Sequence, residues 1–251
     1  MQRARKIVGV AKTARRTYDI LPMPTRSLPA LAGFVASLFA AAALATAPPA
    51  AEHRPLKIID KPMLRQSTTR PAGQKIDFVM LHFCSDVLQH PDHPFDVDRI
   101  VSIFSHAPAS ANYLIDRDGT VYRFVPETRA AWHAGGGSLH WMPSVKAMNT
   151  RSIGIEMFAV GSEDDMKLFG MKDYESWAKQ HPQFVGFTAQ QYATLNELLS
   201  EIEKRHPDVK HDRDHIIGHE EWAGRGRRTD PGELFDWTKI GLTKERPTTQ
   251  P

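Results

Sequence analysis

The feature that most constrains the fold of this chain is a series of short apolar runs, each bounded by loop-forming residues. The predicted strands are residues 75–83, 112–115, 121–125, 152–160 and 215–218. Short runs rich in β-branched and aromatic residues are typical of strands. Between the second and third runs, the pair Asp118–Gly119 is a hairpin turn signal. The sequence therefore predicts a sheet assembled from short strands.

Helical patterns lie between and after these strands. Thr188 and Gln191 form a capping box, in which each side chain can bond the other residue's backbone amide. Apolar residues then recur at helical spacing until the helix stops before Pro207: Tyr192, Leu195, Leu198, Leu199 and Ile202. A short helix is predicted over residues 96–105, and an irregular surface excursion over 161–187. Strands with covering helices imply an α/β domain around a central sheet.

The first 45 residues read as a secretory signal. They hold seven Lys or Arg residues and one acidic residue, and an apolar, alanine-rich run follows over residues 28–47. The run ends in A-x-A patterns, which favour cleavage after Ala45. Met23 would begin a signal of more ordinary length. The run is also about as long as a membrane span, so an uncleaved N-terminal anchor is the alternative.

The remaining chain divides into a linker, a domain and a tail. We predict a Pro-containing linker over residues 46–74, a folded domain over 75–242 and a polar, frayed tail over 243–251. Because the leader carries a net charge of about +6, the rest of the chain carries about −3. The overall charge of +3 is therefore no argument that the folded part binds nucleic acid.

Cysteine and histidine usage restricts the kind of metal site that is possible. The chain has one cysteine, Cys84, and twelve histidines. A single cysteine excludes a disulfide framework and a cysteine-rich cluster. Any metal site must therefore use imidazole and carboxylate ligands. We interpret Cys84 as a partly buried thiol that points to the same face as His82 if the strand continues that far.

Three candidate ligands lie at the end of a predicted strand or at the start of a turn. His82 and His219 each follow a short apolar run, and Asp230 begins an Asp-Pro-Gly turn. Two imidazoles and a carboxylate suit Zn²⁺, and three protein ligands leave a fourth position for water, as in catalytic sites. A histidine at a strand end is also commonly a satisfied or exposed residue. The spacing alone leaves both interpretations open.

Several motifs together resemble one enzyme family. They are VMLHF (79–83), SANYLIDRDGTVYRFVPE (110–127), AWHAG (131–135), NTRSIGIE (149–156) and IIGHEEWAGRGRRTDPGELFDW (216–237). In this order they resemble the zinc-dependent N-acetylmuramoyl-L-alanine amidases of the AmpD/AmiD-like kind, in the peptidoglycan recognition protein superfamily. The resemblance implies a single domain with a mixed central β-sheet flanked by helices.

The resemblance also implies roles for single residues. It places one Zn²⁺ ion on His82, His219 and Asp230, and it aligns Glu156 with an acidic catalytic residue. The alternative for Glu156 is an exposed strand acid. His133 and Trp132 match a motif that lines the substrate groove, although stacking or core packing is the alternative for both rings.

Two positions depart from the family pattern. Arg228 stands where relatives usually have lysine, so the position keeps a permanent charge that can stabilise an oxyanion but does not readily donate a proton. Asn112 stands where relatives commonly have histidine. Asparagine keeps hydrogen bonding but does not titrate, so we expect Asn112 to bind or orient substrate.

The resemblance implies hydrolysis of the amide between N-acetylmuramic acid and L-alanine in peptidoglycan or muropeptides. The alternative is a non-catalytic peptidoglycan-binding module of the same superfamily, which typically lacks a metal ligand. All three ligand positions and Glu156 are filled here, which favours the enzyme. With the leader, these motifs predict an exported, periplasmic amidase with no nucleic-acid partner and no stable membrane insertion after cleavage.

Overall fold

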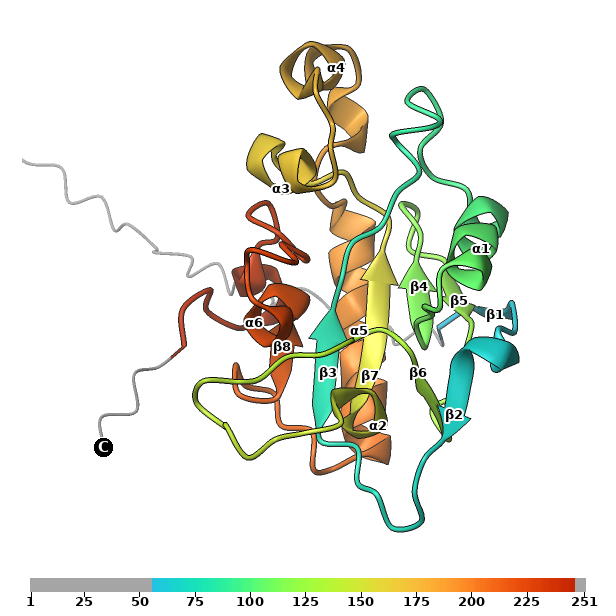
Figure 1. The fold of residues 1–251 in the computed structure, drawn as a ribbon, viewed down its shortest axis with the longest axis vertical. Helices are drawn as coiled ribbons and strands as arrows, with labels where there is room; N and C mark the ends of the chain where they lie inside the picture. The colour runs from blue at the N-terminus through green and yellow to red at the C-terminus, as the bar shows by residue number, and fades with distance from the viewer. Residues whose placement is uncertain (1–55, 247–251) are drawn as a thin grey trace, which may run out of the picture. The chain divides into compact units, whose positions relative to one another are not determined.

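The computed structural model describes residues 56–246 (Figure 1). The predicted signal peptide, the alternative membrane anchor, the first part of the predicted linker and residues 247–251 lie outside the described residues. Over residues 56–246, every helix is too short or too polar to span a lipid bilayer.

A six-stranded mixed sheet forms the centre of the domain, in the order β1-β5-β4-β7-β3-β8. Its strands are β1 Ile58–Asp60, β3 Phe78–Leu81, β4 Tyr113–Ile115, β5 Val121–Arg123, β7 Ser152–Met157 and β8 Ile216–Gly218. Strands β4 and β5 form the predicted antiparallel hairpin, and the other neighbouring pairs are parallel. A second, two-stranded sheet pairs β2 (Ser67–Thr69) with β6 (Arg129–Ala131).

Helices cover the sheet on both faces. Their bounds are α1 Val97–His106, α2 Met148–Arg151, α3 Glu163–Leu168, α4 Tyr174–Gln180, α5 Ala189–Arg205 and α6 His219–Ala223. Short 3₁₀ turns add Leu64–Gln66, Pro182–Phe184 and Trp237–Ile240. In Figure 1, the long helix α5 runs behind β3 and β7, α3 and α4 lie beyond the upper ends of these strands, and α6 lies above β8.

Helix α5 begins and packs as its sequence predicts. The Gln191 amide nitrogen donates to Thr188 Oγ1 (3.1 Å), and the Thr188 amide nitrogen donates to Gln191 Oε1 (2.9 Å). The leucine stripe of the helix packs against strand residues such as Val79 and Ile153, and this cluster is the largest apolar core of the described chain. Burial of this stripe attaches the helix to the sheet.

The prediction that residues 56–74 belong to a linker is wrong. This segment contains β1, which pairs in parallel with β5, and β2, which pairs with β6. Between them Met63 is buried, with 3% of its surface exposed, in a cluster with Phe124 and Ala131. Edge strands of three residues gain their stability from the neighbouring strand, so their own sequence carries a weak signal.

Two other segments are more ordered than predicted. Residues 161–187 contain α3 and α4: a capping box between Ser162 and Asp165 begins α3, and the Trp177 ring is buried. In the part of the tail that the structure describes, the Arg246 guanidinium donates to Glu221 and Asp214. Helix α6 was also missed, because five residues are too few to display a helical period.

Candidate metal centre and active site

The parallel strands β7, β3 and β8 bring three chemical groups to one edge of the sheet. His82 follows directly after β3, and its amide nitrogen continues the ladder by donating to the Ile155 carbonyl oxygen (2.9 Å). His219 follows directly after β8 as the first residue of α6. Glu156 lies near the end of β7. Because carboxyl ends of adjacent parallel strands meet, the three side chains come together across more than 130 residues of sequence.

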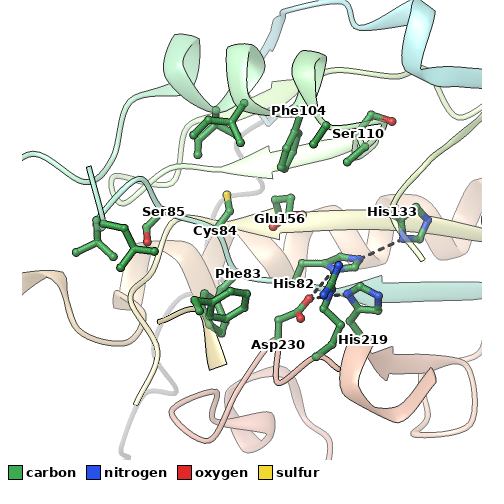
Figure 2. A pocket seen from close by; sticks show the side chains of 18 of the residues that line it. His82, Phe83, Cys84, Ser85, Phe104, Ser110, His133, Glu156, His219 and Asp230 are labelled. Carbon is green, nitrogen blue, oxygen red and sulfur yellow. Dashed lines mark hydrogen bonds and ion pairs between the residues drawn. The ribbon is translucent and has the colours of Figure 1, made fainter. Parts of the chain in front are cut away.

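Asp230 completes a cluster with the two histidines. His82 Nδ1 lies 2.7 Å from Asp230 Oδ2, and His219 Nδ1 lies 3.0 Å from the same oxygen. The potential ligand atoms all lie within 4.8 Å of one another, and all three residues are buried. Figure 2 shows the three side chains converging at the floor of a pocket. The prediction that these residues meet is confirmed.

The charge states in this cluster suit a divalent cation. Burial favours the neutral Asp230 carboxyl, but hydrogen bonds to His219 and His82 outweigh it and hold the Asp230 pKa below its ordinary value. Burial lowers the pKa of His82, against the raising effect of Asp230. Two imidazole nitrogens beside an ionised carboxylate are the donor set that transition metals prefer, so these residues could hold one metal ion.

Glu156 is a buried acid beside this cluster. Only 7% of its surface is exposed, and its Oε2 atom has no hydrogen-bond partner. Burial and the negative charge of Asp230 raise the Glu156 pKa to about 8, whereas Cys84 and Arg228 act in the opposite direction. A buried carboxyl that titrates near neutrality and lines a pocket can take up and release a proton.

These groups open into a pocket of about 470 Å³. Helix α1 contributes an apolar wall with Ile100, Ile103 and Phe104, and Met166 and Phe169 line another part of the pocket. Figure 2 places Phe104 on the side of Glu156 away from the histidines. The candidate ligands and Glu156 therefore share one cavity with a largely apolar wall, a feature that the motifs did not reveal.

The structure also places Trp132, His133 and Arg228 on the pocket lining. Trp132 is half-buried, whereas Arg228 is exposed and donates from Nη1 to the Arg227 carbonyl oxygen (2.9 Å). His133 is buried, and its Nδ1 atom lies 3.1 Å from His82 Nε2. All three side chains therefore share the pocket with His82, His219 and Asp230.

The predicted role of Asn112 in substrate binding is wrong. Its side chain is fully buried and forms no part of the pocket lining. Its Nδ2 donates to the Val125 carbonyl oxygen (3.0 Å), and its Oδ1 accepts from the Gly154 amide (3.0 Å). Asn112 therefore ties β4 to β7 and to the segment after β5, so the amide serves the scaffold.

Cys84 is a partly buried free thiol, as predicted, and it also lies on the pocket lining. Burial, and then the nearby Glu156 carboxyl, raise the pKa of this thiol well above its ordinary value. A thiol with a raised pKa is a poor nucleophile and a poor metal ligand near neutral pH. Cys84 is best described as a neutral neighbour of Glu156 (Figure 2).

Comparisons with known proteins agree with this geometry. A family model described as N-acetylmuramoyl-L-alanine amidase matches residues 72–233. A relative from Enterobacter cloacae, named 1,6-anhydro-N-acetylmuramyl-L-alanine amidase AmpD, is 31% identical over 151 residues, which are 60% of this chain and 63% of that protein. The chain thus spans slightly less than two thirds of that relative.

Two solved structures resemble the fold. The crystal structure of a selenomethionine derivative of AmpD matches with a TM-score of 0.52 and 24% identity, over 74% of this chain and 93% of that one. The structure of AmpDh3 from Pseudomonas aeruginosa in complex with anhydromuramic pentapeptide matches with a TM-score of 0.50 and 25% identity, over 70% of this chain and 64% of that one. The expected mixed sheet with flanking helices is therefore confirmed.

Proposed function

The chain belongs to the N-acetylmuramoyl-L-alanine amidases, a family of hydrolases, and we propose that it hydrolyses the amide between N-acetylmuramic acid and L-alanine in muropeptides. The relative from Enterobacter cloacae is named for the 1,6-anhydro form of the muramyl sugar at this bond, which supports a role in cell-wall recycling. The observation that carries the proposal is the convergence of His82, His219 and Asp230 beside the unpaired Glu156 oxygen in one pocket.

We propose that the metal is a single Zn²⁺ ion held by His82, His219 and Asp230. Their donor atoms lie within 4.8 Å of one another, and two nitrogens with one carboxylate oxygen match the ligand preference of zinc. When bound, zinc supplies Lewis acidity toward the scissile carbonyl and toward a water molecule.

Glu156 has the environment of a general base. Its carboxylate takes a proton from the attacking water as the new bond to the carbonyl carbon forms. It then gives that proton to the L-alanine nitrogen as the amide bond breaks, so the residue ends the cycle in its starting state. Burial of Glu156 favours its protonated form, which supports a carboxyl group that takes up a proton and then releases it. A protein that only bound peptidoglycan would have no use for such a group.

Arg228 stabilises charge in the reaction, and Trp132 helps to position the substrate. The Arg228 guanidinium carries a permanent charge at the pocket and stabilises the negative charge that develops on the carbonyl oxygen. The half-buried Trp132 ring offers a flat apolar surface to a sugar ring or to the peptide stem.

We also propose that the protein is exported to the periplasm, with cleavage after Ala45. The support is the basic leader followed by an apolar run that ends in A-x-A patterns. The N-terminal sequence of protein recovered from the periplasmic fraction tests this: a chain that starts at Thr46 is expected. Full-length chain retained in the cytoplasm or membrane would contradict it.

Digestion of purified muropeptides, with and without a chelator, tests the activity. Mass spectrometry should find free stem peptides only when metal is present. Glu156→Gln should bind zinc yet release few peptides, whereas Glu220→Gln should release them normally. Glu220 is the matched control because burial also raises its pKa to about 8, but it does not line the pocket. Intact muropeptides after incubation with zinc-loaded protein would contradict the proposal.

A further inference from the structure

A chain of hydrogen bonds leads away from the candidate metal centre into the sheet. His82 Nε2, the ring nitrogen that faces away from Asp230, lies 3.1 Å from His133 Nδ1 (Figure 2). His133 Nε2 lies 3.1 Å from Ser152 Oγ, which donates to the Met148 carbonyl oxygen at 2.7 Å. His82, His133 and Ser152 are all buried, so water does not compete readily for these bonds.

The last acceptor sets the direction of every hydrogen in this chain. The Met148 carbonyl can only accept, so it takes the Ser152 hydroxyl hydrogen. Ser152 Oγ must then accept from His133, which places a hydrogen on His133 Nε2. In the neutral ring this leaves His133 Nδ1 bare, so it accepts from His82 Nε2–H. With zinc bound, the His82 hydrogen therefore points away from Asp230, and the Nδ1 lone pair faces the metal position; the hydrogen bond between His82 Nδ1 and Asp230 belongs to the metal-free cluster.

The second histidine reaches the same state by a shorter route. His219 Nε2 lies 3.1 Å from the Ala134 carbonyl oxygen, which again can only accept. His219 therefore also carries its hydrogen on Nε2 and presents Nδ1 toward Asp230. One histidine is oriented directly by a backbone carbonyl, and the other is oriented through two intervening side chains.

We infer that His133 and Ser152 are positioning residues, which select the His82 tautomer that binds metal. This inference rests on the proposed metal centre and adds the residues that prepare one of its ligands. Such outer partners fix the tautomer and ring orientation of a metal-bound histidine. Neither residue needs to contact the substrate for this role.

The local fold holds the His133 ring in place for this task. The Asn149 side-chain oxygen accepts from the backbone amides of His133 (3.1 Å) and Ala134 (2.8 Å). Gly154 on β7 leaves room for the ring, because a Cβ atom there would lie 2.5 Å from the His133 ring. A larger residue at position 154 would displace the imidazole from its two partners.

Replacement of the serine tests the direction of the chain. In Ser152→Ala, His133 Nε2–H loses its acceptor, and the His133 hydrogen can move to Nδ1. That tautomer would donate to His82 Nε2 and keep a hydrogen on His82 Nδ1, where the metal should bind. We expect zinc affinity, measured by competition with a chromophoric chelator, to fall roughly 10- to 100-fold. Gly154→Ala should weaken zinc binding in the same direction by displacing the ring.

Ser67→Ala is the matched control for loss of a buried hydroxyl. Ser67 Oγ donates to the Leu64 carbonyl oxygen (2.7 Å) and accepts from Arg129 Nε (2.7 Å), but it lies outside the pocket lining. This variant should lose stability and keep its zinc affinity. If Ser152→Ala and Ser67→Ala bind zinc equally well, the inference is overturned.

Nitrogen-15 NMR of the histidine rings tests the inference without a variant and without any activity. In the full-length wild-type protein loaded with zinc, His133 should be the Nε2–H tautomer. In Ser152→Ala its ring signals should move toward the Nδ1–H form. A wild-type His133 that carries its hydrogen on Nδ1 would overturn the inference. Failure to cleave muropeptides would instead overturn the proposed function and leave the tautomer result intact.

Discussion

Asp230 is the residue on which the two histidines converge, since one of its oxygens lies within 3.0 Å of an Nδ1 atom from each ring. Asp230→Ala should therefore abolish both zinc retention and activity. Metal analysis of the purified variant checks this. Asp86→Ala is the control, because Asp86 is also a buried aspartate beside a histidine, His90, but lies outside the metal cluster. Stoichiometric zinc in Asp230→Ala would refute the ligand assignment.

Glu156 should behave as a group that moves protons rather than as a ligand. Glu156→Gln keeps the shape of the side chain but removes its acid–base function. We expect zinc content to stay normal while kcat falls by roughly 10²-fold or more, the size typical of lost acid–base catalysis. Turnover close to that of the wild type would move this role to another residue.

The raised pKa of Glu156 also predicts how stability depends on pH in the metal-free protein. In the unfolded chain the carboxyl titrates near its ordinary value of 4.5, whereas in the folded protein it titrates at about 8. Between these values the folded state binds the proton more tightly, so the free energy of unfolding decreases as pH rises through this window. Within the window, each rise of one pH unit removes about 1.4 kcal/mol.

Glu156→Gln has no titratable group at this position. Its free energy of unfolding should therefore fall less than that of the wild type as the pH rises from 5 to 8. Urea unfolding in the presence of a chelator, at several pH values, measures the difference. If the free energy of unfolding changed equally with pH in the two proteins, the assigned pKa would be contradicted.

Arg228 should act through its charge. Arg228→Ala is expected to lower kcat by roughly 10²-fold, as for other donors that stabilise an oxyanion. Arg228→Lys keeps the charge and should retain most of the activity. A faster Arg228→Lys enzyme would show that lysine at this position performs a step, such as proton donation, that arginine does not. Steady-state kinetics of the two variants separates these outcomes.

At the scale of helices and strands, the predictions from sequence were most accurate where residues close together in the chain determine the structure. The capping box at Thr188, the helix that follows it and the Asp-Gly hairpin are all present as predicted. Their signals lie within a few residues of one another. By contrast, β1, β2 and β6 have three residues each and depend on pairing with distant strands. Their sequences contain too little of a period to reveal them.

The capping box of α5 should contribute measurably to stability. Thr188→Ala removes the side-chain acceptor of the Gln191 amide, and we expect the free energy of unfolding to fall by about 1 kcal/mol. Urea denaturation measures the change. The exposed Thr68 on β2 provides the control: Thr68→Ala should change stability less. Equal losses in the two variants would mean that the cap contributes little.

At the scale of the whole molecule, the domain should begin before the boundary that the sequence suggested. A chain that starts at residue 56 keeps β1, β2 and Met63, whereas a chain that starts at residue 75 loses all three. Loss of the buried Met63 side chain alone should lower the free energy of unfolding by about 2 kcal/mol. Urea unfolding of both truncated chains checks this, and equal stability would contradict the assigned boundary.

The sequence by itself determined the types of residue that carry the chemistry and the elements that have strong local signals. The candidate ligands His82, His219 and Asp230 and the helix after Thr188 were identified in this way, whereas Glu156 was singled out by its resemblance to a family motif. This was possible because capping, strand formation and metal preference depend on residue type and short-range spacing.

Only the tertiary structure decided what surrounds each of these groups. Asn112 is fully buried, and its side chain accepts a hydrogen bond from the backbone amide of Gly154, which lies 42 residues away in the sequence. Glu156 has a pKa of about 8 because the folded chain removes water from it and brings Asp230 close. His133 lies between His82 and Ser152 only because β3 and β7 are neighbours in the sheet. Burial and hydrogen-bond partners depend on contacts between distant segments, and the order of the strands creates those contacts.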